Sequence, residues 1–218
     1  MPGESMEPMH CLIEPGDSAG PVIVLLHGRG SDERDLLPLG RQLHATATIV
    51  SVRAPFAAAP WGYGAGWAWY RFVGGTTPEA TSFVAGQEAI DQFIRSHLEA
   101  RLGRKPGPLF IGGFSQGGTT SLAYALRSPG VVSGVMVFSG FLAAHPSVDA
   151  GSIGATAVWW GHGTMDAAIP FAHAEAGWNA LREAGAELTT VTREGVGHTI
   201  DAVELERART WLQERSAA

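Results

Sequence analysis

Short apolar runs alternate with longer stretches of helical periodicity from about residue 21 onward. Most of these runs are continuous and rich in valine and isoleucine, with no polar alternation. Such runs are typical of strands that helices cover on both faces, as in a parallel sheet. The predicted strands are residues 22–26, 48–52, 109–114, 132–138, 156–161 and 188–192, of which the last alternates more and suits a sheet edge.

Apolar side chains at helical spacing fill the intervals between these strands. Residues 31–44 favour a broken helix, because Pro38 and Gly40 lie inside the segment. The alternation of strand and helix predicts an α/β fold with a mainly parallel central sheet and helices on both faces. The predicted helices are residues 81–102, 116–127, 171–183 and 201–214, with Asp201 as the N-cap of the last.

The chain shows no internal repeat and no linker that would divide it. Its 218 residues suit one domain with a single large core, which we expect over residues 21–218. Residues 1–20 hold three prolines and three glycines and are predicted to form an N-terminal tail, or a short edge strand at residues 9–14. The glycine- and aromatic-rich segment 61–70 is predicted to be a long loop.

Composition and charge narrow the function classes. A net charge of −6, with no basic cluster longer than Arg104-Lys105, argues against a nucleic-acid partner. The longest apolar runs fall far below the ~20 residues of a membrane span, so no stable membrane insertion is expected. The first residues lack a basic, apolar signal pattern, and we expect a cytoplasmic location. The single cysteine, Cys11, excludes an intrachain disulfide.

Ser115 lies in a G-x-S-x-G motif between the predicted strand 109–114 and the predicted helix 116–127. Small residues are needed beside the serine because the turn is sharp, and a side chain there would strike the neighbouring strand or helix. The turn presents the hydroxyl at a helix N-terminus, where unpaired N–H groups attract negative charge. An incidental serine in a tight turn is the alternative, but the placement favours a nucleophile.

A serine hydroxyl needs a base, and the base needs a carboxylate that orients it. His198 follows the last predicted strand, and Asp166 is the only acid between Asp149 and Glu175. The order serine, aspartate, histidine is the one expected in α/β-hydrolases. A surface histidine and a turn aspartate are the alternatives for these two residues. His162, four residues before Asp166, lacks a third ligand at a known spacing, so we predict neither a metal site nor a cofactor.

An oxyanion hole requires the N–H of the residue after the nucleophile and a second N–H from the loop after an early strand. Gln116 supplies the first backbone donor. The strand at residues 22–26 leads into the turn HGRGS, where Arg29 supplies the second. We interpret the side chain of His27 as a buried, hydrogen-bonded group rather than a base.

With these motifs in place, the sequence resembles the phospholipase/carboxylesterase family of α/β-hydrolases, which includes bacterial carboxylesterases and acyl-protein thioesterases. The resemblance covers about residues 21–212. It implies a serine esterase that uses Ser115, Asp166 and His198 on a small-molecule ester. The matching segments are LHGRG at residues 26–30, GFSQGG at 113–118, GHGTMDAAIP at 161–170 and GH at 197–198.

Two other functions stay open at this point. The same residues would hydrolyse thioesters, including acylated proteins, and a hydrolase scaffold can also serve as a binding module. A homodimer is also open, because some members of the family form dimers.

Residues 139–153 are too few for a large cap, which predicts an open site that favours short or medium acyl chains. Family members often carry an apolar residue where Arg29 stands, so we expect that a substrate with an acidic group near the acyl carbon is favoured. Trp69, Tyr70, Phe141 and Leu142 are the candidate pocket residues, although aromatic side chains more often pack in the core.

Overall fold

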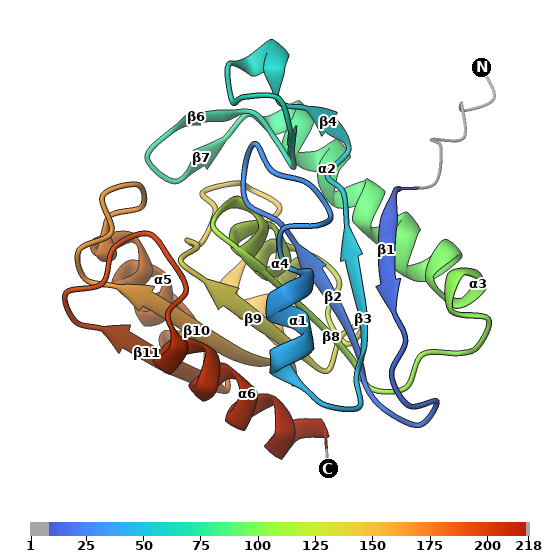
Figure 1. Cartoon of the computed structure of the whole chain (residues 1–218). Coiled ribbons are helices and arrows are strands. Elements are labelled where there is room, and N and C mark those ends of the chain that lie inside the picture. Colours follow the sequence, from blue (N-terminus) through green and yellow to red (C-terminus); the bar gives the residue numbers. More distant parts are fainter. Residues whose placement is uncertain (1–8, 217–218) are drawn as a thin grey trace.

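Seven strands form one sheet in the order β1-β3-β2-β8-β9-β10-β11, shown in the computed structural model of Figure 1. The structure describes residues 9–216, so the first eight residues of the predicted N-terminal tail lie outside it. Six strands are parallel, and β1 alone pairs antiparallel, with β3. The strands are β1 (Cys11–Glu14), β2 (Val22–Leu26), β3 (Thr48–Val52), β8 (Leu109–Phe114), β9 (Gly134–Phe138), β10 (Ala157–Gly163) and β11 (Leu188–Arg193).

Helices cover both faces of the sheet, which confirms the predicted fold class. Alternate side chains of β2 enter two separate cores: Val24 packs in the core on the side of α2, α4 and α5, and Leu25 packs in the core on the side of α1 and α6. The continuous apolar runs therefore fill two cores at once. The helices are α1 (Leu37–Leu43), α2 (Ala80–Gln92), α3 (Leu98–Leu102), α4 (Gln116–Arg127), α5 (Phe171–Glu183) and α6 (Ala202–Ser216).

The long helix predicted over residues 81–102 is interrupted. A π-helical turn, η2 (Phe93–His97), separates α2 from α3, and the Leu98 N–H bonds to the Phe93 carbonyl oxygen. A π-turn adds one residue without removing the apolar stripe, so the periodicity alone does not reveal it. The broken helix predicted over residues 31–44 is reduced to α1, with a proline in its first turn.

Short strands replace part of the long loop predicted over residues 61–70. β4 (Phe56–Ala57) pairs with β5 (Trp67–Ala68), and β6 (Phe72–Gly74) pairs with β7 (Thr77–Pro78). Both hairpins lie at the end of the sheet to which its parallel strands point (Figure 1). The 3-10 turns are η1 (Ala59–Trp61) and η3 (Ala150–Ile153).

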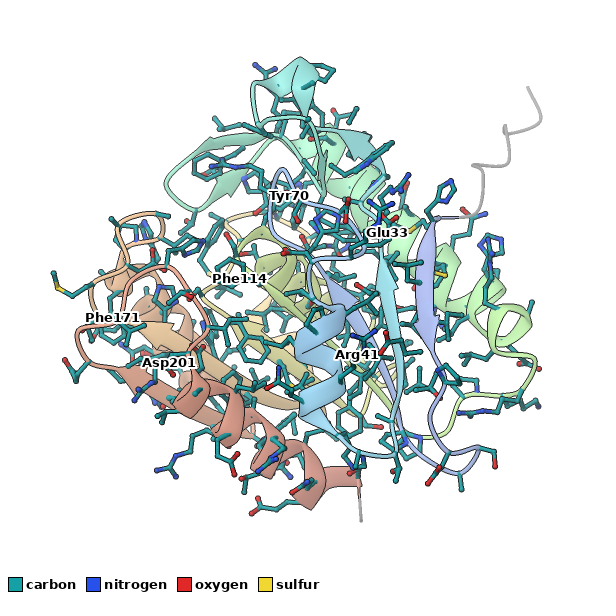
Figure 2. All side chains as sticks on the ribbon, viewed as in Figure 1. Glu33, Arg41, Tyr70, Phe114, Phe171 and Asp201 are labelled. Carbon is teal, nitrogen blue, oxygen red and sulfur yellow. The ribbon has the colours of Figure 1, made fainter. Side chains whose placement is uncertain are left out.

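The carboxyl end of the sheet is where the loops after β2, β8, β9, β10 and β11 gather. Figure 2 shows Tyr70 and Phe114 at this end, beneath the hairpins. The connection from β9 to β10 holds only η3, so no large cap covers these loops. Within residues 9–216, no helix has the length and apolar character needed to cross a membrane.

Candidate active site

Ser115 occupies the sharp turn between β8 and α4. Its φ of 56° and ψ of −118° are strained for a residue with a side chain. The Ser115 N–H donates to the Phe138 carbonyl oxygen at 2.8 Å, which ties the turn to the end of β9. The turn therefore holds the hydroxyl at the carboxyl edge of the sheet, at the N-terminus of α4.

Glycines beside Ser115 let three backbone segments approach closely. A Cβ on Gly113 would press against the Leu26 carbonyl oxygen and the backbone of Gly117. A Cβ on Gly117 would press against the carbonyl oxygens of Leu26 and His27. Neither contact can relax without moving β2, so the strain at Ser115 is held in place by the packing of β2, β8 and α4.

Ser115, His198 and Asp166 form one hydrogen-bonded chain. The Ser115 hydroxyl lies 2.9 Å from His198 Nε2, and His198 Nδ1 lies 2.7 Å from Asp166 Oδ2. Because a carboxylate only accepts, the Nδ1–H donates to Asp166 and Nε2 is left to accept the hydroxyl proton. This is the tautomer that a histidine base needs.

Asp166 is buried and held as an acceptor. Its Oδ1 accepts the backbone N–H groups of Ala168 and Ile169, at 2.9 and 2.8 Å, which fixes the orientation of the carboxyl group. His162 Nε2 lies 3.3 Å from Asp166 Oδ2 and 2.9 Å from the Ile169 carbonyl oxygen. Burial lowers the pKa of His162, so this ring supports Asp166 as a neutral group.

The loops that carry Asp166 and His198 are tied to each other. The Thr164 N–H donates to the Arg193 carbonyl oxygen at 3.0 Å, and the Met165 N–H donates to the Val196 carbonyl oxygen at 2.9 Å. Phe114 packs beside His198, with 4.7 Å between ring centroids. These contacts fix the distance between the imidazole and the carboxylate through neighbouring strands β10 and β11.

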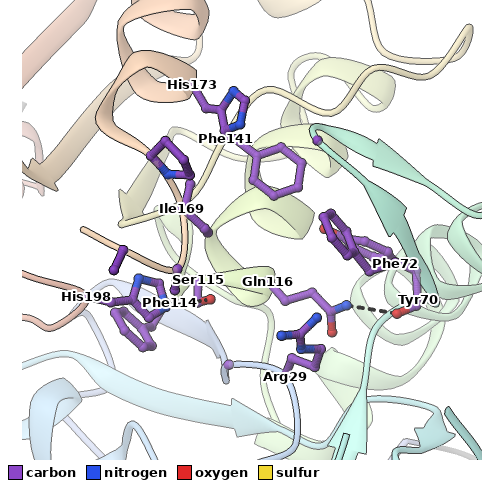
Figure 3. Close-up of a pocket in the computed structure, with 15 residues that line it drawn as sticks. Arg29, Tyr70, Phe72, Phe114, Ser115, Gln116, Phe141, Ile169, His173 and His198 are labelled. Atoms are coloured by element: carbon purple, nitrogen blue, oxygen red, sulfur yellow. Dashed lines mark hydrogen bonds between the residues drawn. The ribbon is translucent and has the colours of Figure 1, made fainter. Parts of the chain in front are cut away.

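The two residues expected to form an oxyanion hole, Gln116 and Arg29, both line the cavity that holds Ser115. Gln116 opens α4, so its N–H has no acceptor within the helix. Its side chain is used elsewhere: Oε1 accepts the Trp69 N–H at 2.9 Å, and Nε2 donates to the Tyr70 carbonyl oxygen at 2.8 Å. Arg29 lies across the pocket from His198 (Figure 3), and both Arg29 and Gln116 line the same cavity as Ser115.

His27 fixes the loop that carries Arg29, and its interpretation as a buried structural histidine is confirmed. Its Nε2 accepts the Ala54 N–H at 3.0 Å, and its Nδ1–H donates to the Gly28 carbonyl oxygen at 2.7 Å. Burial lowers the pKa of His27, so the ring is neutral. The Trp69 indole N–H donates to the His27 carbonyl oxygen at 2.8 Å, which joins this loop to the hairpin segment.

A cavity of about 540 Å³ opens over Ser115. Of the four candidate pocket residues, Tyr70 and Phe141 line it. Trp69 is fully buried against His27, and Leu142 packs on the hydrophobic core, so these two are absent from the lining over residues 9–216. The lining consists of Gly28, Arg29, Tyr70, Phe72, Gly75, Phe114, Ser115, Gln116, Phe141, Ala167, Ala168, Ile169, Pro170, His173 and His198.

Phe72, Ile169 and His173 also belong to this lining, and the roles of Ile169 and His173 in it were not expected from the sequence. Their positions depend on the hairpin β6–β7 and on the path of the chain after Asp166, which have no local signature. Phe141 reaches the pocket because Ser139 adopts a φ of 50°, and the Phe141 N–H then donates to the Thr119 hydroxyl at 3.0 Å. Over the described residues, no group of three histidine, cysteine or acidic side chains could hold a metal ion.

Comparison with known proteins identifies the family of this chain. The phospholipase/carboxylesterase family matches residues 8–216. Esterase YpfH of Escherichia coli K12 is 30% identical over 86% of this chain and 79% of its own length. Acyl-protein thioesterase 1 of Cryptococcus neoformans is 24% identical over 94% of this chain and 96% of its own. The crystal structure of a Bacillus cereus carboxylesterase matches the fold with a TM-score of 0.83 over 97% of this chain and 96% of that one, at 20% identity.

Gly117→Ala tests the close approach around Ser115. We expect a loss of about 2 kcal/mol or more in the free energy of unfolding, because the new methyl meets the carbonyl oxygens of Leu26 and His27, which cannot move aside. Urea denaturation followed by circular dichroism measures it. Gly151→Ala is the matched control, since its methyl makes ordinary contacts with Asp149 and should change stability by less than about 0.5 kcal/mol. Equal stability of the two variants would contradict the argument.

Proposed function

Since the chain belongs to the phospholipase/carboxylesterase family, we propose that it hydrolyses carboxylic esters through an acyl-enzyme formed on Ser115. The observation that carries this proposal is the hydrogen-bonded chain from the Ser115 hydroxyl through His198 to Asp166, open to a pocket at the carboxyl edge of the sheet. The carboxylesterase and thioesterase relatives support the same reaction class.

The first half-reaction forms the acyl-enzyme. His198 Nε2 takes the proton of the Ser115 hydroxyl while the oxygen attacks the ester carbonyl, and the carbonyl oxygen becomes an oxyanion. The backbone N–H groups of Arg29 and Gln116 bind that oxyanion, each contributing on the order of 3 kcal/mol to lowering the barrier. The imidazolium, held by Asp166, then returns the proton to the departing alcohol oxygen.

The second half-reaction frees the enzyme. Water enters the open pocket, His198 takes one of its protons, and the hydroxide attacks the acyl carbon. The oxyanion forms again in the same place and collapses as Ser115 leaves with the proton from His198. The products are a carboxylic acid and a free Ser115 hydroxyl, so each cycle consumes one water.

Thioesters undergo the same two steps with a thiol as the leaving group. We therefore keep acyl-thioester hydrolysis as the second candidate, which the similarity to an acyl-protein thioesterase favours. The two activities are separated by comparing kcat/KM for an oxygen ester and a thioester of the same acyl chain.

A fluorophosphonate probe tests the nucleophile. We expect one adduct, located by mass spectrometry on Ser115, because within residues 9–216 this is the serine hydroxyl that bonds to His198. Ser115→Ala should abolish both the adduct and ester hydrolysis. Ser147→Ala is the control serine, since its hydroxyl bonds to His145 on the surface, and this variant should label normally. Labelling at any other serine, with Ser115 unmodified, would remove the proposed mechanism.

Acyl-chain length tests the shape of the pocket. Because no large cap covers Ser115, we expect kcat/KM for p-nitrophenyl esters to peak at short or medium acyl chains and to fall for long chains. Assays below the micelle-forming concentration of each ester measure this. A steady rise up to the longest chain would show that a long acyl site exists, although the nucleophile assignment would survive.

A further inference from the structure

The pocket over Ser115 holds a cation and no anion. Among the described residues that line it, none is an aspartate or a glutamate, although the chain as a whole carries a net charge of −6. Arg29 is the permanently charged group of the lining, and the rest of the wall is largely aromatic and aliphatic. The local charge of the pocket is therefore opposite in sign to that of the protein.

The Arg29 guanidinium is held by aromatic rings rather than by a carboxylate. Its central carbon lies 4.6 Å from the centroid of the Tyr63 ring and 5.8 Å from that of Phe72. Such contacts orient an arginine while leaving its N–H donors free. In the part of the chain that the structure describes, no acidic side chain forms an ion pair with Arg29.

Two acidic neighbours of Arg29 in sequence, Asp32 and Glu33, are already paired with other arginines. Asp32 lies 3.1 Å from Arg34, and Glu33 lies 2.6 Å from Arg53. The Arg53 guanidinium lowers the pKa of Glu33 to about 2, so Glu33 stays ionised and its ion pair with Arg53 persists. Two carboxylates of the loop after β2 thus pair with other arginines, and within residues 9–216 Arg29, which lines the pocket, has no counterion.

From these observations we propose that the site prefers esters that carry an anionic group, a carboxylate or a phosphate, next to the reacting carbonyl. The inference rests on the proposed esterase function. Arg29 contributes its backbone N–H to the oxyanion hole, so its side chain begins beside the carbonyl that reacts. An anion there would form a charge-assisted bond with the planar guanidinium of Arg29, an exposed residue that lines the pocket.

Matched pairs of esters test the preference. On the acyl side, the p-nitrophenyl monoester of glutaric acid is compared with p-nitrophenyl pentanoate; on the alcohol side, carboxymethyl butyrate is compared with ethyl butyrate. For one or both pairs, we expect Arg29→Met to lower the anionic-to-neutral ratio of kcat/KM by about 10- to 100-fold. Arg29→Lys should keep part of the ratio. The pair that responds identifies the side of the ester that bears the anion.

Arg34→Met is the control, because its guanidinium is exposed and paired with Asp32 outside the pocket, and it should leave the ratio within about twofold. An unchanged ratio in Arg29→Met for both pairs would overturn the inference. If Ser115 still takes the fluorophosphonate and neutral esters are still cleaved, the proposed function survives that failure.

A second, independent observation concerns Glu204 on α6. Its side chain is fully buried, and within residues 9–216 neither carboxyl oxygen has a hydrogen-bond partner. A Cβ on Gly161 would press against Glu204 Oε1, so the carboxyl lies directly on the backbone of β10. Such a group is far less costly to bury neutral than ionised.

Charges around Glu204 come from three elements. Asp201 precedes it at the start of α6 (Figure 2), Arg193 at the end of β11 pairs with Asp201 at 2.8 Å, and Asp166 lies after β10. Burial first, and then the charge of Asp201, raise the pKa of Glu204 to about 8, while Arg193 and the nearby backbone N–H of Asp201 oppose this. Because Arg193 is paired with Asp201, the negative charge of Asp201 offsets the positive charge of Arg193 at Glu204.

The Glu204 side chain and the loop that carries His198 both pack against strand β10. Gly163, two residues beyond Gly161, lies against the carbonyl oxygens of Val196 and Gly197, just before His198. We infer that Glu204 is a positioning residue. While its carboxyl is neutral, it keeps α6 packed on β10 and thereby keeps the His198 loop in place. Ionisation would place a charge in a buried site at the third residue of α6, the helix that follows His198.

The sign of the pH effect follows from the raised pKa. Between about pH 4.5 and pH 8, Glu204 keeps its proton in the folded chain but loses it in the unfolded chain. The free energy of unfolding therefore falls as the pH rises through this window, and the fall ends above pH 8. We expect kcat of the wild type to decline above pH 8, and Glu204→Gln to retain activity and move that decline upward by about one pH unit or more.

Glu206→Gln on the exposed face of α6 is the control and should leave the profile in place. Kinetics between pH 6 and 10 and urea unfolding at pH 5 and 8 measure both effects. Glu204→Met, apolar and similar in length, should also lose the pH dependence of stability if it folds. An alkaline limb that stays unchanged in Glu204→Gln would overturn the inference.

Discussion

The close approach of three backbones around Gly113 and Gly117 is the constraint on which the site depends. Where β2, β8 and α4 meet, carbonyl oxygens of β2 occupy the space that side chains would need. The turn at Ser115 is strained, and it persists because the surrounding sheet cannot relax around it. A nucleophile that projects from such a turn loses little conformational entropy when it attacks, because its position is set before substrate arrives.

The partners of Ser115 are held by the same sheet, through short loops. β10 and β11 are neighbouring parallel strands, so the residues after them start close together. Backbone bonds from Thr164 and Met165 to the opposite loop then fix the spacing of Asp166 and His198. A second set of bonds, from Gln116 to Trp69 and Tyr70, fixes the front wall of the pocket to the N-terminus of α4. Catalytic geometry and pocket shape therefore share one rigid support.

The parts of this structure that follow from a local residue pattern could be predicted from the sequence. Buried parallel strands, the glycine-flanked turn at Ser115 and loops that follow strands each leave a pattern in neighbouring residues. Prediction failed where the outcome depends on distant packing. Trp69 looks like a pocket residue by its neighbours, but a hydrogen bond to the His27 carbonyl oxygen draws it into the core. The π-turn at Phe93–His97 and the left-handed Ser139 also lack any signal in residue type.

The distribution of charge around the site follows from the reaction. Ester hydrolysis creates a negative charge beside Ser115, and a carboxylate in the pocket wall would oppose it in a medium of low dielectric constant. The carboxylate proposed to orient His198, Asp166, is instead placed behind the imidazole, where two backbone N–H groups and a neutral His162 surround it. Because the imidazole lies between Asp166 and Ser115, the charge of Asp166 acts more strongly on the imidazolium than on the oxyanion. An acidic protein can run this chemistry only if its other carboxylates are kept on the outer surface, paired with arginines, or buried neutral as Glu204 is.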